Sequence, residues 1–188
     1  MEWYDDHESK PAPGRLRLIQ ALVNTLDRES HQDRLADPAH AAPWLTENGL
    51  LSPGEQLTEP DRRTVIEVRE ALRALIIHNT GGPPADGALT RLAGAGRAVA
   101  SLGADGRITL APDGDTVTDR LFGLLLIVKD AQDDGSWGHL KACANDECRW
   151  AFYDRSRNRG GTWCDMADCG NKMKNREFRA RRRARSGV

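Results

Sequence analysis

Four cysteines, all in the last quarter of the 188-residue chain, constrain what this sequence can fold into more than any other feature. They form two close pairs, Cys143 with Cys148 and Cys164 with Cys169, and fifteen residues separate the pairs. Zinc takes four soft ligands in a tetrahedron, and two short turns can each supply two thiolates. The spacing therefore predicts one structural zinc ion held by Cys143, Cys148, Cys164 and Cys169.

Other uses of the four cysteines stay open at the level of sequence. Two disulfides would be unusual in a chain whose start, MEWYDDHESKPAPG, lacks an export signal. An iron–sulfur cluster would use the same four thiolates, and only a spectrum distinguishes it from zinc. His139 is near enough in sequence to act as a substitute ligand. A shell of four cysteines leaves no open coordination position, so a catalytic zinc is not expected.

The residues around the cysteines predict a small finger. The aromatic segment 149–153 and the Gly-rich segment 160–163 are interpreted as a two-stranded hairpin between the two cysteine pairs, and helical propensity follows Cys164. Cys169 then lies near a helix N-terminus, where the helix dipole favours a thiolate. Turn, hairpin and helix together indicate a treble-clef-like finger with four cysteine ligands, whose folding energy comes from the metal.

Charge is distributed unevenly along the chain. The formal net charge is −1, but residues 141–188 carry 13 Lys/Arg against 6 Asp/Glu, a net charge of +7, so residues 1–140 carry −8. One set of basic residues recurs at positions that share a helix face, and a second set alternates, so that its side chains share a side if the segment is extended. These candidate nucleic-acid contacts are Lys172, Arg176, Arg179 and Arg183 in the first set, and Arg155, Arg157 and Arg159 in the second.

Two plainer interpretations of the basic helix compete with nucleic-acid binding. The helix could be a solvated face, or it could dock onto the acidic body of its own chain. Like charges four residues apart, as in Lys172 with Arg176, destabilise an isolated helix, and a polyanionic partner would relieve that repulsion.

Upstream of the finger, the apolar residues recur mostly at helical spacing. The pattern predicts a domain over residues 1–136 that is mainly α with a small β-hairpin (α+β), followed by the small treble-clef-like zinc finger over residues 137–188. The predicted elements are helices at 16–26, 39–48, from a cap at Thr58 or Asp61 to 76, at 86–95 and at 116–131, with a hairpin of 98–102 and 107–110.

Several function classes are not expected. The longest apolar run, Leu121–Val128, is far short of the roughly 20 residues that span a bilayer, so no membrane segment is predicted and a cytoplasmic location is expected. The sequence has no Gly-rich phosphate loop, no Ser/His/Asp order and no clustered carboxylates that would indicate catalysis. The chain is therefore not expected to be an enzyme.

The segment WCDMADCGNKMKNREFRARRR resembles the CGNR zinc finger of bacterial proteins proposed to be stress-induced transcription regulators. Lys172 stands where that family has Arg, and Asp165 stands where it usually has Ser. Segments of the N-terminal part resemble the mostly helical ABATE domain that accompanies this finger. These segments are Leu22–Arg28, Trp44–Leu45 and Val68–Arg73.

The resemblance implies a zinc-dependent, DNA-binding transcription regulator that acts on double-stranded DNA and whose N-terminal domain senses a ligand or stress. Asn24, Arg28 and Arg69 lie on or beside apolar helix faces and could line a pocket for a small anionic effector, although such residues more often cap or pair. The alternative is an RNA- or protein-binding module, since treble-clef fingers serve those roles as readily. One finger reads little sequence, so specificity would call for a homodimer or for recognition of DNA shape.

Overall fold

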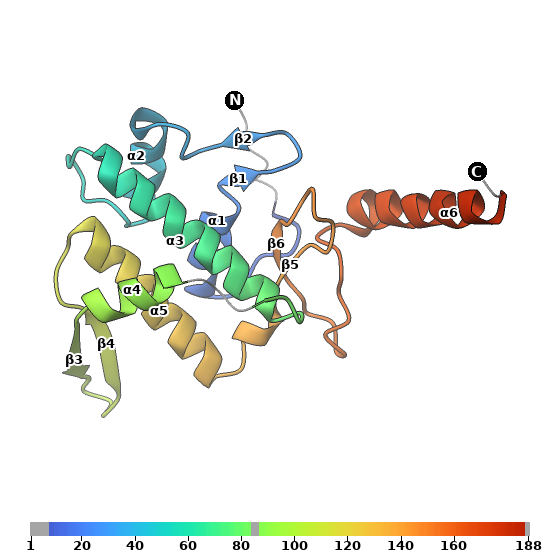
Figure 1. Cartoon of the computed structure of the whole chain (residues 1–188). Helices are drawn as coiled ribbons and strands as arrows, with labels where there is room; N and C mark the ends of the chain where they lie inside the picture. The colour runs from blue at the N-terminus through green and yellow to red at the C-terminus, as the bar shows by residue number, and fades with distance from the viewer. Residues whose placement is uncertain (1–7, 84–86, 187–188) are drawn as a thin grey trace.

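The computed structural model describes residues 8–83 and 87–186. Figure 1 shows a helical body with small two-stranded sheets, from which the last helix projects. Each sheet is an antiparallel pair, formed by β1 with β2, β3 with β4, and β5 with β6. In chain order the elements are α1 (Leu16–Val23), β1 (Leu26–Asp27), β2 (Gln32–Asp33), α2 (Pro38–Glu47), α3 (Glu59–His78), α4 (Gly87–Ala95), β3 (Ala98–Leu102), β4 (Ile108–Pro112), α5 (Val117–Asp133), β5 (Leu140–Ala142), β6 (Ala151–Tyr153) and α6 (Asn171–Ser186).

The two long helices of the body begin at side-chain caps, and the sequence predicts the first of them, at Thr58 or Asp61. The Thr58 side chain accepts the backbone N–H of Asp61 at the start of α3. At the start of α5, Thr116 accepts the N–H of Asp119, whose carboxylate in turn accepts the N–H of Thr116. Such caps satisfy backbone donors that the first helical turn leaves free. The predicted class, mainly α with small sheets, is confirmed.

The core forms where α1, α3 and α5 pack together. Leu121 and Leu124 of α5 are almost completely buried, as are Ile19 and Leu22 of α1 and Leu72 of α3. The prediction that 116–131 is the central core helix is therefore confirmed. None of the helices among the described residues combines the length and apolar character that crossing a membrane requires.

Helix α1 is shorter than its apolar pattern predicts. The pattern continues to Leu26, but α1 ends at Val23 and Leu26 pairs with Asp33 in the β1–β2 ribbon. The chain leaves the helix because the Thr25 hydroxyl donates to the Leu22 carbonyl, and Asn24 turns its amide to a strand far along the chain. The expected helix at 86–95 is present as α4 from Gly87, and Asp86 lies outside the described residues.

The hydrophobic core continues past residue 136. Trp137, Leu140, Ala142 and Ala151 are buried in the same cluster as the residues of α1 and α3. The sequence predicted that 149–153 pairs with 160–163, and that pairing is wrong, because β6 pairs with β5. The apolar side chains of β5 and β6 gain burial against α1 and α3, whereas the Gly-rich segment forms a loop.

Candidate metal centre

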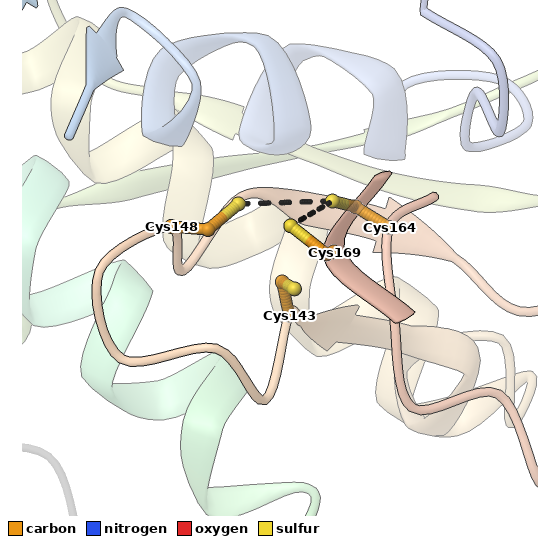
Figure 2. Close-up of side chains that lie close together, drawn as sticks. All are labelled: Cys143, Cys148, Cys164 and Cys169. Carbon is orange, nitrogen blue, oxygen red and sulfur yellow. Dashed lines mark hydrogen bonds between the residues drawn. The ribbon is translucent and has the colours of Figure 1, made fainter. Parts of the chain in front are cut away.

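The four cysteines come from two short segments, one before β6 and one after it, and converge at one point. Cys143 follows β5, Cys148 lies in the turn before β6, Cys164 ends the loop after β6, and Cys169 lies in a short π-helical turn, Met166–Gly170, that leads into α6. Figure 2 shows their side chains directed toward a common centre. All four sulfur atoms lie within 4.8 Å of one another.

The sulfur separations fit a tetrahedral ion. The Sγ atoms of Cys148 and Cys164 are 3.7 Å apart, and those of Cys164 and Cys169 are 3.8 Å apart. A tetrahedron with zinc–sulfur bonds of about 2.3 Å has edges of about 3.8 Å. Disulfides would need S–S distances of about 2.05 Å, and all four thiols are free. The site therefore fits one structural zinc ion, and a closed shell of this kind holds a fold together.

Most of this site is buried. Cys143, Cys148 and Cys169 are buried and Cys164 is half-buried, and the rings of Trp150 and Trp163 pack against them. His139 does not join the cluster. Its ring stacks on Tyr153 and its Nδ1 lies 2.7 Å from the Asp154 carbonyl oxygen, so it is not the substitute ligand considered from the sequence.

Hydrogen bonds to the Cys143 sulfur favour the thiolate form of this one ligand. The thiols of Cys148 and Cys164, together with the backbone N–H groups of Cys164 and Asn145, lower the pKa of Cys143. The Asn145 amide approaches the Cys169 sulfur at 3.8 Å. Burial raises the pKa of the Cys169 thiol, and a divalent cation would offset that burial cost.

A buried ion pair shapes the loop between the two cysteine pairs. Lys141 Nζ donates to Asp154 Oδ2 at 2.9 Å and to the carbonyls of Gly161 and Arg159. The Gly161 N–H donates to the same carboxylate at 2.7 Å, and a Cβ on Gly161 would lie 2.7 Å from Asp154 Cγ, so this close approach needs glycine. Although burial acts to raise it, hydrogen bonds from Lys141, Ser156 and Gly161 hold the pKa of Asp154 below its usual value. Sequence reasoning missed this pair because a lone Lys in a strand carries no signal.

The finger is joined to the body by buried hydrogen bonds. Asn24 donates to the Ala151 carbonyl at 2.9 Å and accepts the Ala151 N–H at 2.8 Å, and Gln20 donates to the same carbonyl at 3.1 Å. Arg73 Nη1 donates to the Arg149 carbonyl at 3.1 Å. The first strand residue after Trp150 is thus clamped by α1, and the metal site has a fixed position on the body.

The three residues predicted to line a pocket have other contacts. The Asn24 amide forms hydrogen bonds with the backbone of Ala151. Arg69 is buried, and its guanidinium pairs with Asp33 at 2.6 Å and with Glu70 at 2.8 Å. Arg28 is exposed and approaches the Asp146 carbonyl at 3.5 Å. The structure does not gather these side chains around one cavity, so the anionic pocket stays a prediction without a supporting contact.

Two family models match the chain. The ABATE model, described as "Putative stress-induced transcription regulator", matches residues 16–133, and the CGNR zinc finger model matches residues 139–182. The chain belongs to the ABATE family. A search of curated proteins finds no matching sequence. The buried pairing of α1 with Ala151 thus joins the ABATE domain to its CGNR zinc finger.

In this ABATE protein the predicted basic stripe lies along one side of α6. Lys172, Arg176, Arg179 and Arg183 line a single shallow groove, as their spacing predicts. Lys172 contacts Asp168 at 2.9 Å and Glu29 at 3.2 Å, and hydrogen bonds to Asp168 and then to Glu29 raise its pKa. Arg176 lies 3.6 Å from Glu147.

The second set of basic residues does not form the arrangement predicted for an extended segment. Arg155, Arg157 and Arg159 are all exposed, but the chain turns here, because the Arg159 N–H donates to the Ser156 carbonyl and Arg159 has a left-handed φ of 48°. The segment is therefore not extended, and an extended segment was the condition for the three side chains to share one side. Arg155 also donates to the Pro11 carbonyl at 3.0 Å.

Proposed function

We propose that this ABATE protein is a zinc-dependent transcription regulator that binds double-stranded DNA through α6. One observation carries the proposal: α6 is strongly basic and none of its described side chains is buried. Residues 171–186 hold eight Lys/Arg and one Asp/Glu. A polar helix that buries no face gains little from packing, and like charges along it oppose its formation. A polyanion would supply the missing stabilisation.

The placement of α6 supports contact with a large partner. Figure 1 shows α6 extending away from the body. Its 16 residues span about 24 Å, and the major groove of B-DNA, about 12 Å wide, admits a helix. The alternative in which the helix docks onto its own acidic body is not supported by the ion pairs between the described residues of α6 and the body, which involve Lys172 and Arg176 near the start of the helix.

The ion pairs divide the basic stripe into two halves. Lys172 and Arg176 have acidic partners within the chain, whereas no ion pair among the described residues involves Arg179 or Arg183. Phosphates would therefore meet uncompensated charge at the distal half of α6. We assign the main phosphate contacts to Arg179 and Arg183.

A salt series tests this proposal. Fluorescence anisotropy of labelled duplex DNA would be recorded for the zinc-loaded protein, for an R179Q/R183Q variant and for a control, R63Q/R91Q, which removes two exposed arginines from α3 and α4. Each lost phosphate contact lowers the magnitude of the log–log salt slope by about 0.9, so the double variant should lose about 2 and the control almost nothing.

Two results would count against DNA binding through α6. Absence of duplex binding at low salt would refute the proposed function. Equal loss in the two double variants would show that binding depends on net charge and not on α6.

RNA binding is the second candidate, and one observation favours it. Phe178 is 62% exposed on α6 among arginines, and an exposed ring can stack on an unpaired base. The other aromatic residues near the finger count against it, since Phe152 is buried and Trp150 and Trp163 are half-buried against the cysteines. Single-stranded DNA and RNA arms of the same salt series separate the candidates, because preferred binding to single strands that F178A abolishes would favour RNA.

A sensing role for the ABATE domain remains part of the proposal. The cavity beside the cysteines, about 660 Å³, is bordered by Glu8, Asp27, Glu29, Asp165 and Asp168. Carboxylates repel an anion, so the predicted anionic effector does not suit this cavity.

A further inference from the structure

The loop between β1 and β2 belongs to the ABATE domain, yet its tip touches the finger. Glu29 Oε1 lies 3.2 Å from Lys172 Nζ, at the start of α6, and 3.4 Å from the amide of Asn145, which itself approaches the Cys169 sulfur. One carboxylate therefore contacts both the first cation of the basic stripe and a residue beside the metal centre.

The position of Glu29 is fixed from the body. Asp27 accepts the backbone N–H groups of Glu29 and Ser30, and its second oxygen accepts the Ser30 hydroxyl at 2.6 Å. At the other end of the loop, Asp33 is held by the buried Arg69 of α3 through two hydrogen bonds, at 2.6 and 3.1 Å. A continuous chain of polar contacts thus runs from α3 through the β1–β2 loop to α6.

Glu29 lies where the stripe could otherwise take a phosphate. A Lys ammonium offers three donors, and Lys172 directs its donors at Asp168 and Glu29. Asp168 lies four residues before Lys172, in the short turn that leads into α6, whereas Glu29 comes from the other domain. A phosphate and Glu29 would therefore compete for the same cation.

We propose that Glu29 is an intramolecular competitor of nucleic acid, through which the ABATE domain regulates the affinity of α6. Binding of DNA at Lys172 releases the β1–β2 loop, and any change in the ABATE domain that holds the loop in place weakens DNA binding by the same factor, because linkage is reciprocal. The inference rests on the proposed DNA-binding function. It assigns Lys172 to regulation, whereas Arg179 and Arg183 supply the constant contacts.

The test compares E29Q with the wild-type protein and with E67Q, which removes one exposed carboxylate that pairs with Arg91 on the body. E29Q should bind duplex DNA about two- to fivefold more tightly at low salt, as expected for release of an exposed ion pair, and E67Q should bind like the wild type. In K172Q the same E29Q change should have no effect beyond that of E67Q. An equal gain in E29Q and E67Q, or a gain from E29Q that persists in K172Q, would overturn the inference.

A second measurement does not depend on binding. Amide hydrogen exchange of residues 27–33 in the free protein should be faster in E29Q than in the wild type, and should be unchanged in E67Q. Unchanged exchange in E29Q would show that Glu29 does not hold the loop. Faster exchange without duplex binding by any variant would refute the proposed function but leave the loop contact standing.

Discussion

Replacing Asn24 by Ala tests how the finger is attached to the body. The amide makes three hydrogen bonds: it donates to the carbonyl of Ala151 and to Glu8, and it accepts the N–H of Ala151. In the β5–β6 ladder the N–H and carbonyl of Ala151 point away from β5, since the neighbouring residues Cys143 and Trp150 form the bonded pair. The N–H of Ala151 therefore has no partner within the sheet to replace Asn24.

The cost of losing the two bonds to Ala151 can be worked out bond by bond, without counting the partly buried bond to Glu8. The Ala151 carbonyl keeps its hydrogen bond from Gln20. Loss of the bond from Asn24 therefore costs about as much as one ordinary hydrogen bond, about 1 kcal/mol. The buried N–H is left unsatisfied, which costs about 1–3 kcal/mol. The free energy of unfolding should fall by about 2–4 kcal/mol, a large part of the roughly 5–15 kcal/mol that stabilises a typical domain.

Urea unfolding at a fixed free zinc concentration, followed by circular dichroism, measures this loss. Asn48→Ala is the matched control, because its amide makes one bond, to the Trp44 carbonyl at the end of α2, and should cost about 1 kcal/mol. If Asn24→Ala costs no more than Asn48→Ala, the clamp between α1 and β6 does not contribute as described.

Three further predictions concern the loop, the core helix and the exposed hairpin. The lowered pKa of Asp154 means that its carboxylate stabilises the fold at any pH above its unfolded-state pKa, which is about 4. The difference in unfolding free energy between the wild type and Asp154→Asn should therefore be constant above about pH 5 and shrink as the pH falls below about 4. A difference that grows as the pH falls would contradict this expectation. Thr116→Ala should lower the free energy of unfolding by about 0.5–2 kcal/mol through loss of the α5 cap, which calorimetry can check against the cap-retaining Thr116→Ser. Leu102→Lys and Ile108→Lys should each change stability by no more than about 0.5 kcal/mol, because these side chains are 74% and 72% exposed on the β3–β4 hairpin, and a loss above about 2 kcal/mol would show that the hairpin is covered.

Local signals in the sequence predict much of this structure. The cap at Thr58 and the apolar stripe that follows it predict α3, and the apolar run of 121–128 predicts α5, because these signals lie within the helix or within a few residues of its start. The cysteine spacing specifies the metal site for a similar reason, since each pair sits in one short turn.

Features that depend on distant partners could not be predicted. Asn24 was interpreted as part of a pocket, but its partner Ala151 is 127 residues away, and Arg69 pairs with Asp33, 36 residues away. The same holds for β6. The sequence pattern favours its pairing with the Gly-rich segment 160–163, but β6 pairs with the three residues that precede Cys143. Burial of β5 and β6 against α1 and α3 decides that pairing, and no local sequence pattern predicts this burial.

One metal ion held by four thiolates positions α6 on the body. Substitution of cobalt(II) for zinc, with metal content measured on the same sample, tests it most directly. We expect one metal ion per chain, the intense visible bands of tetrahedral cobalt with thiolate charge transfer, and loss of both in a variant that replaces Cys164 and Cys169 by Ser. Octahedral cobalt bands, a native iron–sulfur spectrum, or a protein that folds with two disulfides and no metal would contradict it.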